Sequence, residues 1–408
     1  MRIAHINLFD FQGGAAKIAE DIIAASDAMG YESLRFVHRP MRPDARTIPI
    51  PLLGGPYQKF SEAPQDGIVP HVHATALLPI LLHPAFVSAD IIHLHCINGG
   101  YFSYLLLPFL AVKPLVWTMH DTLAVTANCL QAQYCEKWKT EDCLDCPLDA
   151  ATKKADGIDR RNILQKTKAN ILQTAHFTAV APSRWIERLL KESAFKNQDI
   201  RMIHNGIHTD VFCPHDKKEA RKLLGLPRDK KIVLFAAHGG LKNPFKGGKF
   251  LLDALRIAAN KREQWFLLEV GAGGEKIEYP VLGMAVPYVQ DEKRMALYYS
   301  AADVFVSTSL SESFGLTVCE AQACGTPTVA FAAGGITEVV EQEKTGYLVK
   351  VGDVETLFDR MKSVLDSPKL ADAFAEQARK RAERLFSVTM MGEKYLRLYQ
   401  ELGAAKQG

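Results

Sequence analysis

Two glutamates, Glu312 and Glu320, flank a glycine within residues 311–340. An apolar, β-branched run ends at Ser307, and we expect a helix over residues 316–324. The first turn of a helix leaves backbone N–H groups without helical partners and carries a partial positive charge. A helix that starts after Gly315 therefore suits a phosphate, and the segment predicts a site for a long anionic ligand.

The spacing of the two glutamates indicates how they act. If both lay on one helix, eight positions would separate them by roughly 12 Å of rise. That distance is too long for a shared proton and marginal for a glycosidase acid and base. We therefore expect the two carboxylates to hold opposite ends of one ligand. The alternative, common for isolated glutamates, is a loop acid at Glu312 and a solvated helix residue at Glu320.

Other candidate ligand residues follow expected strands, where open parallel sheets bind ligands. Gly13 and Gly14 follow the first strand and open a helix, without forming a G-x-G-x-x-G fingerprint. His120 follows the strand at residues 115–119, and Lys242 and Lys246 follow the strand at residues 231–236. The alternatives are a plain turn at the glycines, a structural histidine and solvated loop lysines.

The composition excludes some classes of protein. A chain of 408 residues predicts two domains, and 49 basic against 46 acidic residues give a net charge of +3. This balance is too mild to indicate a nucleic-acid partner, and it is compatible with a local basic patch at a membrane surface. The N-terminus has no signal-peptide pattern, and Pro108, Lys113 and Pro114 interrupt the most apolar stretch. We therefore expect a cytoplasmic protein.

The eight cysteines fall into two groups. Four are scattered in apolar settings, as small core residues are. The other four lie within 18 residues: Cys129, Cys135, Cys143 and Cys146. In a cytosolic chain such a cluster indicates either a structural zinc site or thiols of variable redox state that bind no metal. No set of ligands that would activate water is evident, so we predict no catalytic role for this cluster.

The order of elements indicates an α/β fold with parallel sheets. Strands and helices alternate over residues 1–204, with a cysteine-bearing insertion at 125–158. A second series of strands and helices occupies residues 205–386, and a final helix lies within residues 387–408.

The chain resembles the retaining glycosyltransferases of family 4. The resemblance implies the GT-B architecture, in which two Rossmann-like parallel-sheet domains face each other across a cleft and a C-terminal helix crosses back to the N-terminal domain. The cysteine insertion after His120-Asp121 also resembles that of a bacterial polysaccharide-assembly subgroup. The motifs that carry the resemblance are Gly13-Gly14-Ala15, residues 117–121, Ala181-Pro182-Ser183, residues 204–207, Lys246-Gly247, Ala301-Ala302-Asp303, Glu312 with Glu320, and Gly334-Gly335-Ile336.

The resemblance also implies roles for individual residues. Glu320 would bind the ribose of a nucleotide donor, and Glu312 would bind the sugar. The diphosphate would be held by Lys246, by the backbone of Phe314, Gly315 and Leu316, and by Gly13 and Gly14 of the other domain. His120 would contact the donor sugar near the reacting carbon. The family usually has an arginine about five residues before this lysine; the chain has none there, and Lys242 is the expected substitute.

The activity implied is transfer of a sugar, with retention, from a nucleoside diphosphate to a hydroxyl of a glycan or lipid-linked acceptor. Its expected setting is bacterial surface polysaccharide synthesis, with peripheral contact at the inner face of the cell membrane. No Asp-x-Asp stands at an expected strand end, so we predict that catalysis requires no metal cofactor. The alternatives are a nucleotide-sugar epimerase of the same architecture and a non-catalytic nucleotide-sugar-binding protein.

Overall fold

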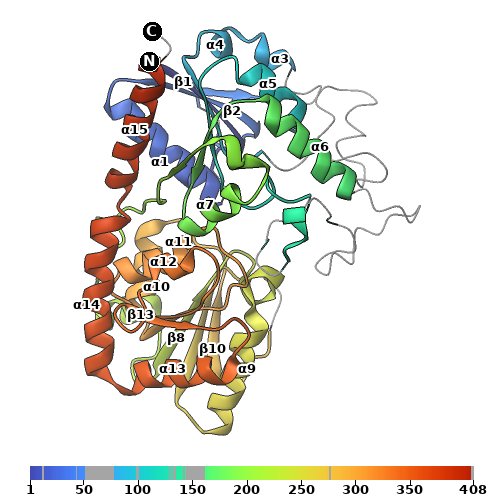
Figure 1. Cartoon of the computed structure of the whole chain (residues 1–408). Helices are drawn as coiled ribbons and strands as arrows, with labels where there is room; N and C mark the ends of the chain where they lie inside the picture. The colour runs from blue at the N-terminus through green and yellow to red at the C-terminus, as the bar shows by residue number, and fades with distance from the viewer. Residues whose placement is uncertain are drawn as a thin grey trace. The chain divides into compact units, whose positions relative to one another are not determined.

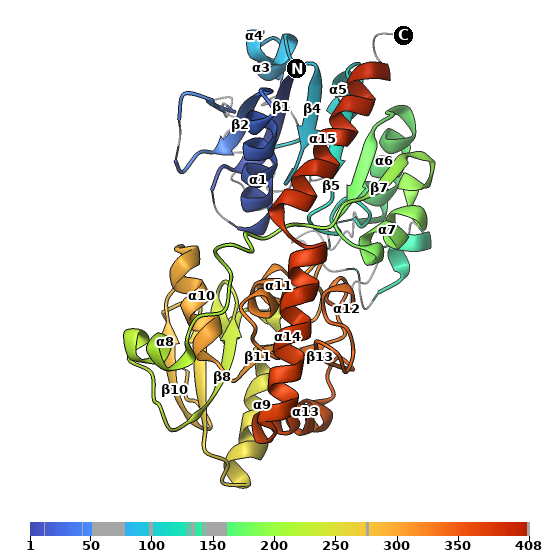
Figure 2. The same cartoon turned by 90° about the vertical axis from the view of Figure 1, so that its left-hand side faces the viewer.

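The computed structural model describes residues 1–11, 13–42, 44–50, 78–97, 101–127, 129, 132, 135–140, 143, 161–274 and 277–405. The chain forms two compact units: residues 1–204 with 391–408, and residues 205–390. The predicted division at 204/205 coincides with the first limit, and the predicted division at 386/387 lies four residues before the second. Figures 1 and 2 show helices on both faces of the sheet in each unit.

The N-terminal unit contains a parallel sheet of seven strands in the order β3-β2-β1-β4-β5-β6-β7. The strand order reverses between β1 and β4, which is where open α/β sheets bind ligands. The strands are β1 Arg2–Phe9, β2 Glu32–Arg39, β3 Thr47–Pro49, β4 Ile91–Leu94, β5 Leu115–Thr118, β6 Thr178–Ala181 and β7 Asp199–Met202.

The helices of this unit begin where cap residues and glycines allow. The Ser183 hydroxyl accepts the Ile186 N–H at 3.2 Å and so caps the helix that begins at Arg184. The helices are α1 Gly14–Ala28, α3 Leu78–Leu81, α4 Pro84–Val87, α5 Leu107–Leu110, α6 Arg161–Thr174, α7 Arg184–Lys191 and α15 Val388–Ala405, and the 3-10 turns are η1 Tyr104–Leu106, η3 Lys137–Thr140 and η5 Ala194–Asn197.

Helix α15 is the final element of the chain, and most of it belongs to the N-terminal unit. It approaches α1 so closely that a Cβ added at Gly392 would lie 2.7 Å from the Ala25 Cβ. Its tyrosines Tyr395 and Tyr399 are fully buried. Among the helices in the described ranges, none is long and apolar enough to span a membrane.

The C-terminal unit contains a parallel sheet of six strands in the order β10-β9-β8-β11-β12-β13. Its order reverses between β8 and β11, and the loops that follow these two strands carry the predicted donor residues. The strands are β8 Lys231–Ala236, β9 Trp265–Val270, β10 Leu282–Val286, β11 Val304–Ser307, β12 Thr328–Phe331 and β13 Gly346–Val349.

Helices and 3-10 turns connect these strands. They are α8 Lys217–Leu224, η6 Gly240–Lys242, η7 Pro244–Lys246, α9 Gly248–Asn260, α10 Glu292–Ala301, α11 Leu316–Ala323, α12 Ile336–Val339, α13 Val354–Asp366 and α14 Pro368–Leu385. The predicted α/β class with two Rossmann-like parallel sheets is therefore confirmed. The predicted arrangement of the two units across a cleft stays a prediction.

Candidate functional site

Helix α11 starts at the residue where it was expected. A helix was expected over residues 316–324; the structure has it over Leu316–Ala323, with Gly315 as the cap residue and no side-chain cap. Gly315 has φ +101°, a left-handed conformation that glycine adopts at little cost. The first-turn amides therefore have neither a helical partner nor a side-chain cap, which suits an anion.

Glu312 lies in the loop before α11, so the single-helix spacing assumed for the two glutamates is wrong. Its Oε1 forms an ion pair with Lys246 Nζ and accepts a hydrogen bond from Ser309 Oγ at 3.0 Å. The Lys246 and Glu312 side chains are only 26% and 19% exposed. The structure thus brings together two residues that were predicted separately, and it fixes the lysine beside the start of α11.

The loops that carry this pair are also joined through their backbones. Thr308 Oγ1 donates to the Lys246 carbonyl at 3.0 Å, and the Leu310 N–H donates to the Phe245 carbonyl, also at 3.0 Å. A Cβ on Gly247 would lie 2.1 Å from the Thr308 carbonyl oxygen, so only glycine permits this approach. The Lys-Gly pair is therefore held against the loop that follows β11.

The Gly334-Gly335 pair supports the same loop from the other side. The Gly335 N–H donates to the Glu312 carbonyl at 2.8 Å. A Cβ on Gly335 would lie 2.4 Å from the Ser313 carbonyl oxygen and 2.7 Å from the Phe314 Cα. The backbone of residues 312–314 is thus packed directly on this glycine.

Replacing Gly335 with alanine should lower the free energy of unfolding of the C-terminal unit by about 2 kcal/mol or more, because backbone atoms must move to admit the methyl group. Thermal unfolding by circular dichroism measures the change. Gly273→Ala is the matched control, because a Cβ at Gly273 meets no atom within 4 Å. Equal melting temperatures for the two variants would contradict this packing.

Glu320 lies on α11 and is only 8% exposed, so the alternative of a solvated helix residue is wrong. Its Oε2 accepts a hydrogen bond from the Tyr299 hydroxyl at 2.9 Å. Burial and the neighbouring Glu320 carboxylate raise the pKa of Tyr299 well above its ordinary value. Tyr299 therefore remains a donor and orients the glutamate.

The other predicted donor residues have different degrees of exposure. The Phe314 side chain is buried and packs edge-to-face on Phe386, so it is the backbone of this residue that the prediction concerns. Leu316 is half-buried at the first position of α11. Lys242 is exposed at the end of η6.

The sequence analysis missed Glu269, which is buried at 2% exposure on β9. Its Oε1 accepts the Leu241 N–H at 2.8 Å, and its Oε2 accepts a hydrogen bond from Tyr279. A Cβ on Gly240 would lie 2.1 Å from Glu269 Oε1. The carboxylate thus holds η6, which carries Lys242; the available signal was a glutamate inside an apolar strand.

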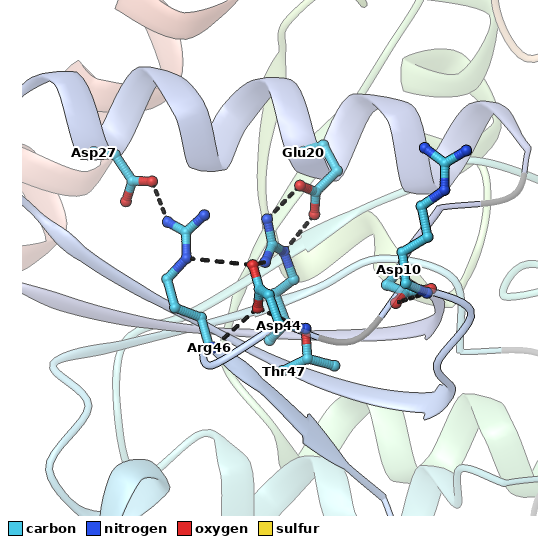
Figure 3. Close-up of polar contacts among 8 residues, drawn as sticks. Asp10, Glu20, Asp27, Asp44, Arg46 and Thr47 are labelled. Carbon is cyan, nitrogen blue, oxygen red and sulfur yellow. Dashed lines mark hydrogen bonds and ion pairs between the residues drawn. The ribbon is translucent and has the colours of Figure 1, made fainter. Parts of the chain in front are cut away.

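In the N-terminal unit, Gly13 adopts φ +87° and caps α1, and Gly14 is the first helical residue. Both glycines are exposed. The preceding loop is fixed by Asp10, which Figure 3 shows. Its carboxylate accepts the backbone N–H groups of Met41 at 2.7 Å and Arg42 at 2.9 Å. The Arg42 guanidinium lies 3.4 Å from the centre of the Phe11 ring. These contacts hold the turn that the glycines follow.

Ion pairs fix the elements around that turn. Arg35 on β2 bonds both carboxylate oxygens of Glu20 on α1 and also Asp44 at 2.7 Å. Arg46 pairs with Asp27 at the end of α1 and with Asp44 (Figure 3). These ion pairs join α1, β2 and the turn before β3. They therefore hold in place the helix that begins at Gly14.

His120 follows β5 and is partly buried. It lines a small pocket, with room for about one water molecule, together with His95, Trp117 and Asp121. Its Nε2 lies 3.2 Å from His95 Nδ1. Burial lowers the pKa of His120 to about 4, so its imidazole is neutral at physiological pH.

Three further histidines, His5, His93 and His95, lie buried behind His120 on or next to β1 and β4. Within the described part of the chain, they are the one group of histidine, cysteine or acidic residues close enough to share a metal ion. Burial is the main cause that lowers the pKa of each, that of His5 to about 3, and the positive charge of Arg35 adds to the effect at His5. The sequence analysis missed this cluster, although histidines alternate at positions 93 and 95 of an apolar strand.

Hydroxyl groups connect this cluster to α15. His93 Nδ1 lies 2.6 Å from the Tyr399 hydroxyl, and His93 Nε2 lies 2.8 Å from Thr118 Oγ1. Thr118 Oγ1 in turn lies 2.8 Å from the Tyr395 hydroxyl. A buried polar network therefore holds the last helix against β4 and β5.

The sequence analysis also missed Lys168 on α6, which is buried. Its ammonium donates to the carbonyls of Leu123, Thr126 and Ala127 at 3.0, 3.2 and 2.8 Å. Burial lowers the pKa of Lys168 to about 7, although Asp121 acts to raise it. The lysine holds the segment directly after His120-Asp121.

The cysteine cluster is described only in part. Cys129, Cys135 and Cys143 are each partly buried, and Cys146 lies outside the described residues. The ligand set as a whole therefore stays a prediction.

The sequence itself matches known families over most of its length. The profile of Glycosyltransferase Family 4 matches residues 12–211, and that of Glycosyl transferases group 1 matches residues 216–381. D-inositol 3-phosphate glycosyltransferase 2 of Catenulispora acidiphila is 30% identical over 349 residues, which are 81% of this chain and 75% of that protein. This chain belongs to the glycosyltransferases that combine these two domains.

A second relative is the D-inositol 3-phosphate glycosyltransferase of Mycolicibacterium smegmatis. It is 33% identical over 305 residues, which are 71% of this chain. The matched region spans 63% of the length of that relative.

Solved structures share the fold. Sucrose-phosphate synthase from Thermosynechococcus elongatus has a TM-score of 0.71 at 24% identity, with 99% of each chain covered. Anabaena HepE in complex with UDP-glucose has a TM-score of 0.69 at 18% identity, with 98% of this chain and 100% of that chain covered. Both likenesses support the two-sheet fold of GT-B type.

Proposed function

We propose that this protein is a retaining glycosyltransferase that moves a sugar from a nucleoside diphosphate to a hydroxyl of a glycan or lipid-linked acceptor. The observation that carries the proposal is the Lys246–Glu312 pair beside the uncapped start of α11. The D-inositol 3-phosphate glycosyltransferase relatives support the transfer of a sugar, and the UDP-glucose complex of HepE supports the donor class. We assign the activity to bacterial surface polysaccharide synthesis on the resemblance of the cysteine insertion.

The donor would lie along α11 and the loop before it. The first-turn amides and Lys246 supply positive charge for the diphosphate, and Lys242 is the second cation. Glu312 holds the sugar and Glu320 the ribose. Because the Glu312 carboxylate already fixes Lys246, binding the diphosphate requires little reordering of the lysine side chain.

The chemistry is positioning and charge stabilisation. Negative charge grows on the departing diphosphate, and Lys246 with the helix start stabilises it. The leaving phosphate takes the proton of the acceptor hydroxyl, since no separate base is evident, and no metal cofactor is needed in this scheme. In the N-terminal unit, Gly13 and Gly14 contribute to diphosphate binding, and neutral His120 contacts the donor sugar.

Replacing Glu320 with alanine should weaken binding of UDP about 10- to 100-fold, because a hydrogen bond from the ribose to a carboxylate is lost. The kcat at saturating donor should change less. Isothermal titration with UDP and steady-state kinetics measure the two effects. Glu376→Ala, on the exposed face of α14, is the control and should bind UDP normally. Unchanged UDP affinity of the Glu320 variant would remove this glutamate from the site.

A screen by thermal shift against nucleoside diphosphates and nucleotide sugars tests the proposal as a whole, because ligands of the folded state raise its melting temperature. The stabilising nucleotide sugar is then incubated with and without acceptors. Transfer that needs an acceptor supports the proposal. Conversion of the donor alone indicates an epimerase, and binding without turnover indicates a non-catalytic protein.

The proposed cytoplasmic location includes peripheral contact with the membrane face. Apolar side chains are exposed around α4 and α5, at Leu82, Val87, Phe109 and Val112. Lys113 joins these two helices by donating to the carbonyls of Phe86, Val87 and Ala89. Such a group suits the edge of a bilayer, where a lipid-linked acceptor is found.

For the cysteine cluster we propose structural zinc held by Cys129, Cys135, Cys143 and Cys146, against the alternative of thiols that bind no metal. The partial burial of Cys129, Cys135 and Cys143 suits such a site. We expect one zinc per chain in protein purified without chelators, measured by mass spectrometry of metals. Cys143→Ser should reduce it, and Cys213→Ser, outside the cluster, should not. If the purified protein contained no zinc, the cysteines would instead be thiols that bind no metal.

A further inference from the structure

Three imidazoles form a hydrogen-bonded chain that leads to His120. His5 Nδ1 lies 3.1 Å from His95 Nε2, and His95 Nδ1 lies 3.2 Å from His120 Nε2. His5 belongs to β1, His95 follows β4 and His120 follows β5, so three neighbouring strands supply the chain. The ring planes of consecutive members are within 22° of parallel.

Both nitrogens of the central histidine are used, which restricts its protonation. A neutral imidazole has one N–H and one lone pair. His95 is buried, so the doubly protonated cation, which would donate at both ends, is strongly disfavoured. His95 therefore donates to one neighbour and accepts from the other, and only two directions of the chain remain.

The environment of His5, at the far end of the imidazole chain, selects between these two directions. His5 Nε2 is buried and has no hydrogen-bond partner in the described part of the protein. If the chain ran from His120 toward His5, this nitrogen would carry an N–H without an acceptor, a rare condition in folded proteins. If it runs from His5 toward His120, the same nitrogen carries only a lone pair. Arg35 pairs with His5 in register across β1 and β2, and its positive charge favours the lone pair.

We propose that His5 and His95 are positioning residues that hold His120 in the tautomer protonated at Nδ1. His5 Nδ1–H donates to His95 Nε2, and His95 Nδ1–H donates to His120 Nε2. The N–H of His120 is then at Nδ1.

The direction of the chain determines what His120 can do, and this step rests on the proposed function. With Nε2 occupied by His95, His120 meets a donor sugar as a hydrogen-bond donor from Nδ1. It cannot act there as a general base, because a base needs a lone pair at the nitrogen that faces the proton. This agrees with assigning the proton of the acceptor hydroxyl to the leaving phosphate.

The tautomer can be read without any activity, from the nitrogen chemical shifts of protein labelled with 15N at its thirteen histidines. Loss of signals in His120→Asn assigns the resonances of His120. At pH 7.5 we expect a protonated Nδ1 and a bare Nε2. A protonated Nε2 with a bare Nδ1 would overturn the proposal.

Variants of His95 test its role as donor. In His95→Leu the preference is lost and His120 should take up the tautomer mixture of imidazole in water. In His95→Asn an amide replaces the Nδ1–H and should retain the Nδ1-protonated form. His93→Asn is the matched control, because His93 is equally buried two residues away but bonds to hydroxyls. It should leave the His120 tautomer unchanged, and a changed tautomer there would contradict the specific role of His95.

Kinetics separate positioning from general damage. His95→Leu should lower the kcat of sugar transfer about 10-fold with the Kd for UDP unchanged, and His95→Asn should restore most of it. Equal losses in the two variants would count against the positioning role. If the wild-type protein transfers no sugar, the proposed function fails, while the chemical shifts still decide the tautomer.

Discussion

Replacing Lys246 with alanine should lower kcat about 100- to 1,000-fold, the range measured when an enzyme loses one preorganised charge stabiliser. The reason is geometric. Glu312 and Ser309 hold the ammonium at the loop before α11, so its charge needs no reorganisation when the leaving diphosphate becomes more negative. Steady-state kinetics give the loss, and titration with UDP gives the ground-state affinity, which should weaken less than kcat falls.

Two further variants test whether the loss of kcat is specific to the charge at position 246. Lys249→Ala removes an exposed lysine three residues away, which lies over the Phe250 ring, and should leave kcat within about twofold. Lys246→Arg keeps the charge but changes its shape and reach, so it should recover part of the rate. If Lys246→Ala retained the wild-type kcat while UDP affinity fell, the lysine would contribute only to binding.

The sequence predicted the parts of this site but not how they meet. Lys246 and Glu312 were assigned to one ligand by the resemblance to family 4. Their ion pair depends on the adjacency of β8 and β11, which are separated in sequence by β9 and β10. Strand order is a tertiary property, and local patterns of hydrophobicity do not contain it.

Buried polar residues were the other omission. Glu269 and His93 interrupt apolar strands, and Lys168 lies among polar residues of α6. In both settings a charged or polar residue ordinarily indicates a turn or a solvated face. Each is buried because distant backbone or side-chain groups satisfy it, as the carbonyls of Leu123, Thr126 and Ala127 do for Lys168. The partners of Lys168 lie more than 40 residues before it in the sequence, so the sequence alone could not show these contacts.

The same burial predicts that the N-terminal unit is destabilised by mild acid. His5, His93 and His95 have pKa values far below the ordinary 6.5 in the folded protein, because burial disfavours their charged forms. Well above pH 6.5 these histidines are neutral in both states, and their contribution does not change. As the pH falls below 6.5, the unfolded chain binds protons that the folded chain cannot, so the folded state loses stability.

The expected size of this loss is large. At pH 5.5 each histidine with an ordinary pKa in the unfolded chain contributes about 1.4 kcal/mol. The pKa of His120 is also lowered, to about 4, so the four histidines together contribute about 5.5 kcal/mol. A domain is usually stable by about 5–15 kcal/mol, so the unit should approach unfolding near that pH. Urea denaturation between pH 7.5 and 5.5 measures it, with fluorescence dominated by the three tryptophans of this unit, Trp117, Trp138 and Trp185.

Substitutions assign the effect to the buried histidines. His93→Gln should cost stability at pH 7.5, because it disturbs the bonds to Tyr399 and Thr118, but it should reduce the pH dependence by about a quarter. His176→Asn removes an exposed histidine of the same unit and should leave the slope unchanged. A midpoint that stays constant from pH 7.5 to 5.5 would mean that the folded unit accepts protons on these imidazoles, and the neutral hydrogen-bonded chain that leads to His120 would then be wrong as well.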